Sequence, residues 1–227
     1  AKAMNLPSTT FFATGVSIVL HPHSPMAPII HMNVRYFETG NGRWWFGGGI
    51  DLTPHYVVPE DARFFHEQLK STCDRFHADF YPKFRETADD YFFIRHRHET
   101  RGVGGIFFDY LDDQSGLDQE QIFAFTYAVG KTFAPTYARL LENARDRTWG
   151  EPQKHWQMLR RGRYVEFNLV WDRGTKFGLE TNGRVESILM SMPPMASWEY
   201  NRSPEPGSAE AETLGWLRKG VDWILEK

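Results

Sequence analysis

Three polar side chains alternate with apolar ones in one short segment, and their types could move a proton and bind an acid. His31, Asn33 and Arg35 occupy every second position of Ile29–Phe37. Because side chains alternate across a strand, these three share one face and the other face is apolar. Histidine exchanges protons near neutral pH, and arginine binds carboxylates. Two interpretations remain open on this pattern: a solvated outer face of a sheet, or the polar floor of a pocket.

Further polar residues stand where the chain is expected to turn or to pass close to a ligand. Asp51 follows the run Gly47–Gly49, and glycine lets a backbone approach a ligand or another strand closely. Asp172 and Arg173 stand at the exit of an expected strand. Two interpretations of this pair are open: a local cap or ion pair, or part of a site. The tripeptide Asn182-Gly183-Arg184 is a hairpin signal that also places an arginine at a strand end.

Composition excludes several classes of protein. A net charge of −3 in 227 residues does not indicate a nucleic-acid binder. The single cysteine, Cys73, permits no intrachain disulfide and cannot by itself hold an iron–sulfur cluster. No apolar run approaches the ~20 residues of a membrane span. Aromatic residues make up 15% of the chain, which is compatible with a flat aromatic ligand.

Hydrophobic periodicity predicts an α+β fold in a single domain, residues 1–227. Strands expected in groups, with helices between the groups, favour a broad, mostly antiparallel β-sheet flanked by α-helices on both faces. The expected strands are 11–20, 29–37, 44–52, 104–111, 164–171, 178–181 and 186–192. The expected helices are 59–76, 81–93, 118–143, 155–161 and 209–225. From these residues alone, the sequence indicates a domain with a polar, arginine-bearing pocket for an anionic aromatic ligand.

Several motifs run in the same order over nearly the whole chain and carry a family resemblance. They are Val16-Ser17 through His21-Pro22, His31-x-Asn33-x-Arg35-Tyr36-Phe37, Trp44-Trp45-Phe46-Gly47-Gly48-Gly49-x-Asp51, Arg101-Gly102-x-Gly104-Gly105, Gly162-Arg163-Tyr164 through Asp172-Arg173, and Glu186-Ser187 through Trp198-Glu199-Tyr200. Together they resemble the oxygen-dependent coproporphyrinogen III oxidase family. Members of that family have a further N-terminal segment, which we expect this chain to lack.

The resemblance implies oxidative decarboxylation of two propionates of coproporphyrinogen III to vinyl groups, giving protoporphyrinogen IX in haem biosynthesis. Dioxygen is then the co-substrate and no cofactor is required. Whether the reaction also uses a divalent metal stays open. The implied assembly is a homodimer with its interface near residues 163–198. The implied compartment is the cytoplasm, or the mitochondrion if a targeting segment has been removed. Two alternatives stay open: a non-catalytic tetrapyrrole-binding protein, and a metal-dependent oxygenase.

The resemblance also implies roles for individual residues. His31, Asp51 and Asp172 match catalytic positions, with His31 as the proton donor. The substrate-contact positions are Ser17, Asn33, Val34, Arg35, Arg173, Asn182, Gly183 and Arg184. If a metal is required, the matching ligands are His21, His66 and His96.

Overall fold

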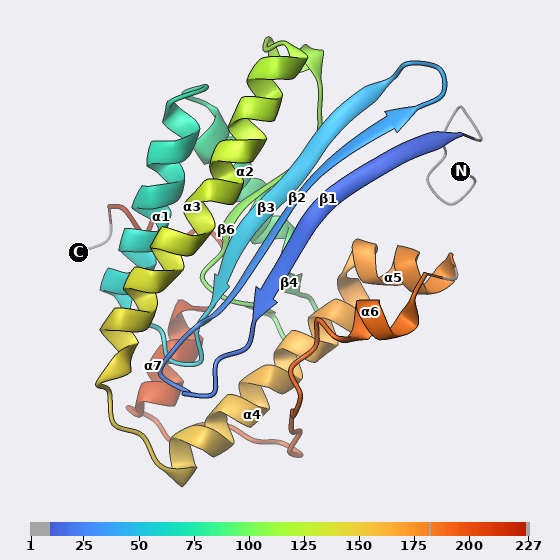
Figure 1. Ribbon diagram of the computed structural model, residues 1–227. Coiled ribbons are helices and arrows are strands. Elements are labelled where there is room, and N and C mark those ends of the chain that lie inside the picture. The colour runs from blue at the N-terminus through green and yellow to red at the C-terminus, as the bar shows by residue number, and fades with distance from the viewer. Residues whose placement is uncertain (1–9, 182, 226–227) are drawn as a thin grey trace.

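A computed structural model describes residues 10–181 and 183–225, and its centre is a four-stranded antiparallel sheet (Figure 1). The strand order is β1-β2-β3-β6, so three sequential strands form a meander and β6 joins the far side of β3. The bounds are β1 (Phe11–Leu20), β2 (Ile29–Thr39), β3 (Trp44–Thr53) and β6 (Gly105–Leu111). A separate small hairpin pairs β4 (Phe93–Ile94) with β5 (Glu99–Thr100).

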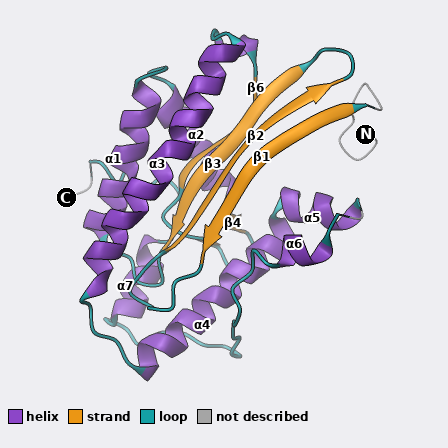
Figure 2. Ribbon diagram, in the orientation of Figure 1, coloured by secondary structure: helices purple, strands orange, loops and turns teal. Residues whose placement is uncertain are grey.

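Helices lie on both sides of this sheet, as Figures 1 and 2 show. One side is covered by α1 (Pro59–Asp74), α2 (Phe80–Tyr91) and α3 (Gln119–Arg145). On the other side, towards one end of the sheet, lie α4 (Glu151–Glu166), α5 (Arg173–Glu180) and α6 (Val185–Leu189). A 3₁₀ turn (Asp113–Ser115), a π-helical turn (Phe167–Trp171) and α7 (Ala209–Trp216) complete the described elements. The α+β class is confirmed, as are helices on both faces.

The main core forms because the apolar face of the sheet meets the apolar faces of α1, α2 and α3. Ile30 and Met32 of β2 and Ile50 of β3 are buried in this core. Helix α3 begins where the Asp118 side chain accepts from the Gln121 backbone N–H and the Gln121 side chain accepts from the Asp118 N–H, a capping box. Five aromatic rings from the turn after α1 and from α2, β6 and α3 pack in this core: Phe76, Phe80, Phe84, Phe108 and Phe125. The opposite, polar face of β2 is thereby left for the site.

The expected strands 164–171, 178–181 and 186–192 are wrong, because this part of the chain is helical. Helix α4 runs on through the expected strand start, and Trp156, Leu159, Tyr164 and Phe167 are all buried on one of its sides. Their spacing follows the helical period, and tertiary packing decided between it and the two-residue alternation that also fits this segment. The sheet is therefore narrower than expected within the described residues.

The C-terminal helix is also shorter than expected. Helix α7 begins at Ala209, where the Ser208 side chain caps it, and ends at Trp216 rather than near residue 225. Gly220 has a φ of 77°, in the left-handed region that an α-helix does not use. Buried Val221 and Trp223 then pack into the main core as an irregular segment. Burial of Val221 and Trp223 in the core thus accompanies an irregular backbone where helical turns were expected.

Gly102 provides a stability test of how closely the loop before β6 approaches β3. A Cβ at Gly102 would stand 2.1 Å from the Leu52 carbonyl oxygen and 2.7 Å from the Thr53 Cα, both backbone atoms. We expect Gly102→Ala to lower the free energy of unfolding by about 1–3 kcal/mol, the usual cost of overpacking. Urea unfolding would measure this.

The matched control is Gly215→Ala in α7, because a Cβ there meets no atom within 4 Å. Alanine is the better helix former, so this variant should be as stable as the parent or more stable by up to about 1 kcal/mol. Equal stability of the Gly102→Ala variant and the parent would contradict the close approach.

Candidate active site

The register of the sheet brings the polar residues of three strands onto one face. His31 of β2 lies opposite Asp51 of β3, and Asn33 lies between Ser17 of β1 and Gly49 of β3. All of these positions share the alternation phase of His31, Asn33 and Arg35, as the sequence predicts. The apolar residues between them face the main core on the other side. The interpretation of β2 as the polar floor of a site is therefore consistent with the geometry.

The centre of this face is a chain of three charged or ionisable groups. The Nδ1 of His31 donates to Oδ1 of Asp51 at 2.8 Å, and Oδ2 of Asp51 accepts from Nη2 of Arg101 at 2.5 Å. Asp51 and Arg101 are buried, whereas about a quarter of the His31 side chain is exposed. Since Nδ1 donates to the carboxylate, the lone pair of the neutral ring is at Nε2. His31 is thus oriented by Asp51 and can take up a proton at Nε2.

Arg101 is held in a box of aromatic rings as well as by Asp51. Its guanidinium carbon lies 4.3 Å from the centroid of Phe92 and 4.7 Å from those of Tyr164 and Phe167. Burial acts to raise the pKa of Asp51, but Arg101 and His31 outweigh it and hold that pKa below its usual range. Asp51 therefore stays a carboxylate near neutral pH and keeps accepting the His31 hydrogen bond.

Arg35 lies further along the same face, above the glycine run Gly47–Gly49 of β3, where no side chains stand. Its guanidinium donates to Asn33 Oδ1 at 2.7 Å and pairs with Asp109 of β6 at 2.9 Å. A Cβ at Gly47 would stand only 2.7 Å from this guanidinium, so a side chain there would displace the end of Arg35. About a third of the Arg35 side chain is exposed. A guanidinium has five N–H donors, so these two contacts leave others for a ligand carboxylate.

Asp172 and Arg173 sit where the π-helical turn meets α5. The Asp172 side chain caps α5 by accepting from the Thr175 N–H at 2.6 Å, so the local-cap interpretation is confirmed. Its other oxygen accepts from the Tyr91 hydroxyl at 2.7 Å. The Arg173 guanidinium lies 5.0 Å from the centroid of the Tyr91 ring. Tyr91, the last residue of α2, thus connects Asp172 and Arg173 to α2.

The remaining substrate-contact positions are distributed over three places. Ser17 is exposed on β1, beside Asn33. The Val34 side chain points to the opposite face and packs against the main core, so only its backbone borders the polar face. Gly183 donates its N–H to the Gly178 carbonyl, and Arg184 is the exposed N-cap of α6. Asn182 lies outside the described residues. The site roles of all five stay predictions.

The three histidines suggested as metal ligands each bond to a different segment. His21 Nε2 donates to the Ser191 carbonyl, and burial lowers the pKa of its ring. Both nitrogens of His66 are hydrogen-bonded, to the Tyr81 hydroxyl and the Val103 carbonyl, and burial lowers its pKa to about 4. Among the described residues, no group of three or more His, Cys, Asp or Glu side chains could hold a metal ion. The structure does not bring this trio together.

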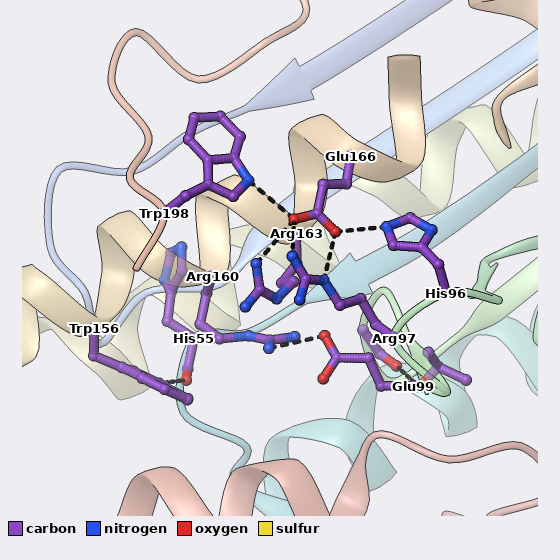
Figure 3. Close-up of polar contacts among 11 residues, drawn as sticks. His55, His96, Arg97, Glu99, Trp156, Arg160, Arg163, Glu166 and Trp198 are labelled. Carbon is purple, nitrogen blue, oxygen red and sulfur yellow. Dashed lines mark hydrogen bonds and ion pairs between the residues drawn. The ribbon is translucent and has the colours of Figure 1, made fainter. Parts of the chain in front are cut away.

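His96 belongs instead to a cluster around Glu166, the last residue of α4 (Figure 3). One Glu166 oxygen accepts from Arg97, Arg163 and Trp198, and the other from His96 and again from Arg97. The Nδ1 of His96 then accepts from the Trp171 indole N–H at 3.0 Å. Because Trp171 precedes Asp172, this cluster fixes the π-helical turn that delivers Asp172 to the site.

Sequence reasoning missed four residues that the structure places at this site. They are Arg101, Tyr91, Phe107 and Glu166. Arg101 had a usable signal, since it opens the glycine-rich motif Arg101-Gly102-x-Gly104-Gly105, but no role was assigned to it. Tyr91 and Phe107 read as ordinary core residues, and Glu166 as one polar position in an expected strand. Nothing in their spacing indicates the partners that they reach across the fold.

Comparison with known proteins shows the family of this chain. The family model described as coproporphyrinogen III oxidase matches residues 1–223, so the chain belongs to this family. The "Oxygen-dependent coproporphyrinogen-III oxidase" of Parasynechococcus marenigrum is 50% identical, over 94% of this chain and 65% of its own. The mitochondrial protein of that name from Homo sapiens is 54% identical, over 94% and 48%. The chloroplastic one from Hordeum vulgare is 50% identical, over 94% and 56%. The chain thus spans about half to two thirds of the length of these curated relatives.

The Glu166 cluster should make stability depend on pH in acid. Burial acts to raise the pKa of Glu166, but Arg97, His96, Arg163 and Trp198 bring it down from 4.5 to about 2. A depressed carboxylate pKa stabilises the fold above pH 4.5, and this stabilisation is lost as the pH falls towards 2. As the pH falls over this range, the parent should lose stability that Glu166→Gln does not have to lose. We therefore expect the free energy of unfolding of the parent to fall by about 2–3 kcal/mol more than that of Glu166→Gln.

Urea unfolding at steps between pH 5 and pH 2.5 would measure the difference. Glu142→Gln is the matched control, because it removes one carboxylate from an exposed ion pair with Arg139 on α3. Parallel curves for Glu166→Gln and the parent would show that the cluster does not couple Glu166 ionisation to folding.

Proposed function

We propose that this protein catalyses the oxygen-dependent oxidative decarboxylation of coproporphyrinogen III to protoporphyrinogen IX, a step of haem biosynthesis. Two propionate side chains each lose carbon dioxide and the equivalent of a hydride, which leaves a vinyl group. The four electrons reduce one dioxygen to two molecules of water, or two dioxygens to hydrogen peroxide. Family membership and the names of the relatives support the proposal. The observation that carries it is the His31–Asp51–Arg101 chain on a polar, arginine-bearing sheet face.

The residues of this face suit the demands of the reaction. The substrate carries four carboxylates, and Arg35 and Arg173 are arginines with exposed surface, Arg35 on the same sheet face as His31. His31 would exchange the proton at Nε2, while Asp51 holds its ring orientation. Asp172, which is only partly buried, would face the pyrrole N–H groups, and Asp51 would act through His31. The electron-rich pyrrole reacts with dioxygen itself, so the proposal requires no flavin and no metal. The protein then supplies orientation and exclusion of water.

Turnover with and without oxygen tests the function directly. Coproporphyrinogen III is incubated with the full-length protein in air and under strict anaerobiosis, before and after exhaustive chelation. We expect divinyl product in air only, undiminished by chelation, followed by fluorescence after oxidation of the product. Activity that chelation abolishes and added metal restores would favour the metal-dependent oxygenase. Binding of the tetrapyrrole without any product in air would favour the non-catalytic binding protein.

Two variants in the same assay separate proton transfer from carboxylate binding. His31→Ala should lower kcat about 100-fold or more, within the usual contribution of a general acid–base. Arg35→Ala should lower kcat/KM about 10- to 100-fold, which corresponds to the ~1.5–3 kcal/mol of a charge-assisted hydrogen bond. Arg139→Ala, which alters an exposed ion pair on α3, is the control for loss of one arginine. Unchanged turnover in either site variant would remove that residue from the mechanism.

We also propose a homodimer with its interface near residues 163–198. Support comes from the many large apolar side chains that this segment exposes in a single chain. They are Leu169, Val170, Leu179, Val185, Leu189, Met190, Met195 and Trp198. Exposed patches of this kind mark interaction surfaces in soluble proteins. We expect sedimentation velocity to show a dimer, and Met190→Glu at the most exposed of these positions to shift it towards monomer. A monomeric parent protein at all concentrations would refute the proposal.

For the compartment, we propose the cytoplasm, or the mitochondrion in the presence of a targeting segment. Cys73 is buried and free, as a reducing compartment allows. No helix among residues 10–181 and 183–225 is long and apolar enough to cross a membrane. The names of relatives place the Hordeum vulgare protein in the chloroplast and the human one in the mitochondrion. Cell fractionation would test the proposed location.

A further inference from the structure

The rings of Tyr91 and Phe107 form a stacked pair with one candidate arginine near each member. Their centroids are 4.2 Å apart and their planes differ by 10°. The guanidinium carbon of Arg35 lies 5.9 Å from the Phe107 centroid, and that of Arg173 lies 5.0 Å from the Tyr91 centroid. Phe107 itself packs over Gly49, where a Cβ would stand 3.3 Å from its ring. One ring of the stack therefore has an arginine of the sheet near it, and the other has the arginine at the start of α5.

The Tyr91 hydroxyl adds polar contacts that a phenylalanine could not make. It donates to Oδ1 of Asp172 at 2.7 Å and accepts from the Arg173 backbone N–H at 3.2 Å. These bonds join the end of α2 to the first turn of α5, about 80 residues later in the chain. The same Asp172 side chain caps α5 through its second oxygen. One hydroxyl group thus sets where α5 begins relative to the sheet.

We propose that Tyr91 is a positioning residue that holds Asp172 and Arg173 at a set distance from Arg35, so that the two arginines can bind two carboxylates of one ligand. The inference rests on the proposed function, since the ligand with several carboxylates is the proposed tetrapyrrole. Each guanidinium lies near one ring of the stack, and rings already in contact cannot approach each other further, so the pair acts as a spacer. Long, flexible arginine side chains would otherwise sample many separations.

The chemistry of the hydroxyl suits a positioning role. Burial and the Asp172 carboxylate raise the pKa of Tyr91 to about 12, so the hydroxyl stays protonated and keeps donating at neutral pH. A packing role for the ring alone would be fulfilled equally well by phenylalanine, whose ring has the same shape. The hydroxyl is therefore the part of Tyr91 whose removal distinguishes positioning from packing.

The test is Tyr91→Phe in the full-length protein, which preserves the stack and deletes the two hydrogen bonds. We expect KM for coproporphyrinogen III to rise about tenfold with kcat within about threefold, the pattern of a lost binding contact. Thermal unfolding should show the variant folded. Tyr127→Phe on α3, where the tyrosine is exposed, is the matched control and should leave KM unchanged. An unchanged KM in Tyr91→Phe would overturn the proposal.

A double-mutant cycle distinguishes positioning of Asp172 from a general loss of stability. In an Asp172→Ala background, Tyr91→Phe should change KM less than twofold, because the acceptor for the Tyr91 hydroxyl is already gone. A full tenfold change in both backgrounds would show that Tyr91 does not act through Asp172, and would overturn the proposal.

The same variants remain informative if the proposed function is wrong and the parent protein gives no product. Equilibrium binding of coproporphyrin III, the stable oxidised tetracarboxylate, is then measured by fluorescence quenching. About tenfold weaker binding by Tyr91→Phe would support the positioning role in a binding protein. Equal binding by parent and variant, or no binding by either, would overturn it.

Discussion

The buried pair of Asp51 and Arg101 is the constraint on which the rest of the site depends. Two charges removed from water are stable only when each compensates the other and further contacts satisfy both groups. Here His31 occupies the second oxygen of Asp51, and three aromatic rings surround the Arg101 guanidinium. The pair therefore requires β3, the loop after β5, α4 and the π-helical turn to be in place at once.

This constraint explains why the two faces of the sheet differ so much. The face against α1, α2 and α3 is a conventional apolar core, built by close packing of aromatic and aliphatic side chains. The other face has a second, smaller core, consisting of Ala88, Phe92, Ile94, Phe107 and Phe167 at the β6 end. Beyond it, Gly47 and Gly49 leave room over β3 for the Arg35 guanidinium and the Phe107 ring. Missing side chains on one strand thus create the space that neighbouring side chains occupy.

Asp172 and Arg173 are positioned from two independent directions. Tyr91 approaches from α2 by hydrogen bonds and ring contacts. On the other side, Glu166 binds His96, and His96 in turn accepts from Trp171, the residue before Asp172. Both nitrogens of His96 are then occupied, which fixes its tautomer and gives it a structural task. A short π-helical turn held at both ends can deliver a side chain more reproducibly than a free loop.

The local pattern of the sequence was sufficient for part of this site. Alternation along Ile29–Phe37 placed His31, Asn33 and Arg35 on one face, and the run Gly47–Gly49 indicated a close approach, now seen with Arg35. The helices α1, α2 and α3 follow from their apolar periodicity and, for α3, from its capping box. Such features depend on neighbours within a few positions, so periodicity and turn chemistry are enough to predict them.

Only the tertiary structure decided which residues far apart in the chain become partners. The residues 164–192 satisfy both a strand alternation and a helical period, and packing of Tyr164 and Phe167 around Arg101 accompanies the helical choice. The sequence by itself determined the family, the α+β class and the polar face of β2. It could not show that Asp51 meets Arg101 or that Tyr91 meets Asp172, 50 and 81 positions away. Pairings at such separations leave no local periodicity, because they are set by the free energy of the whole packed domain.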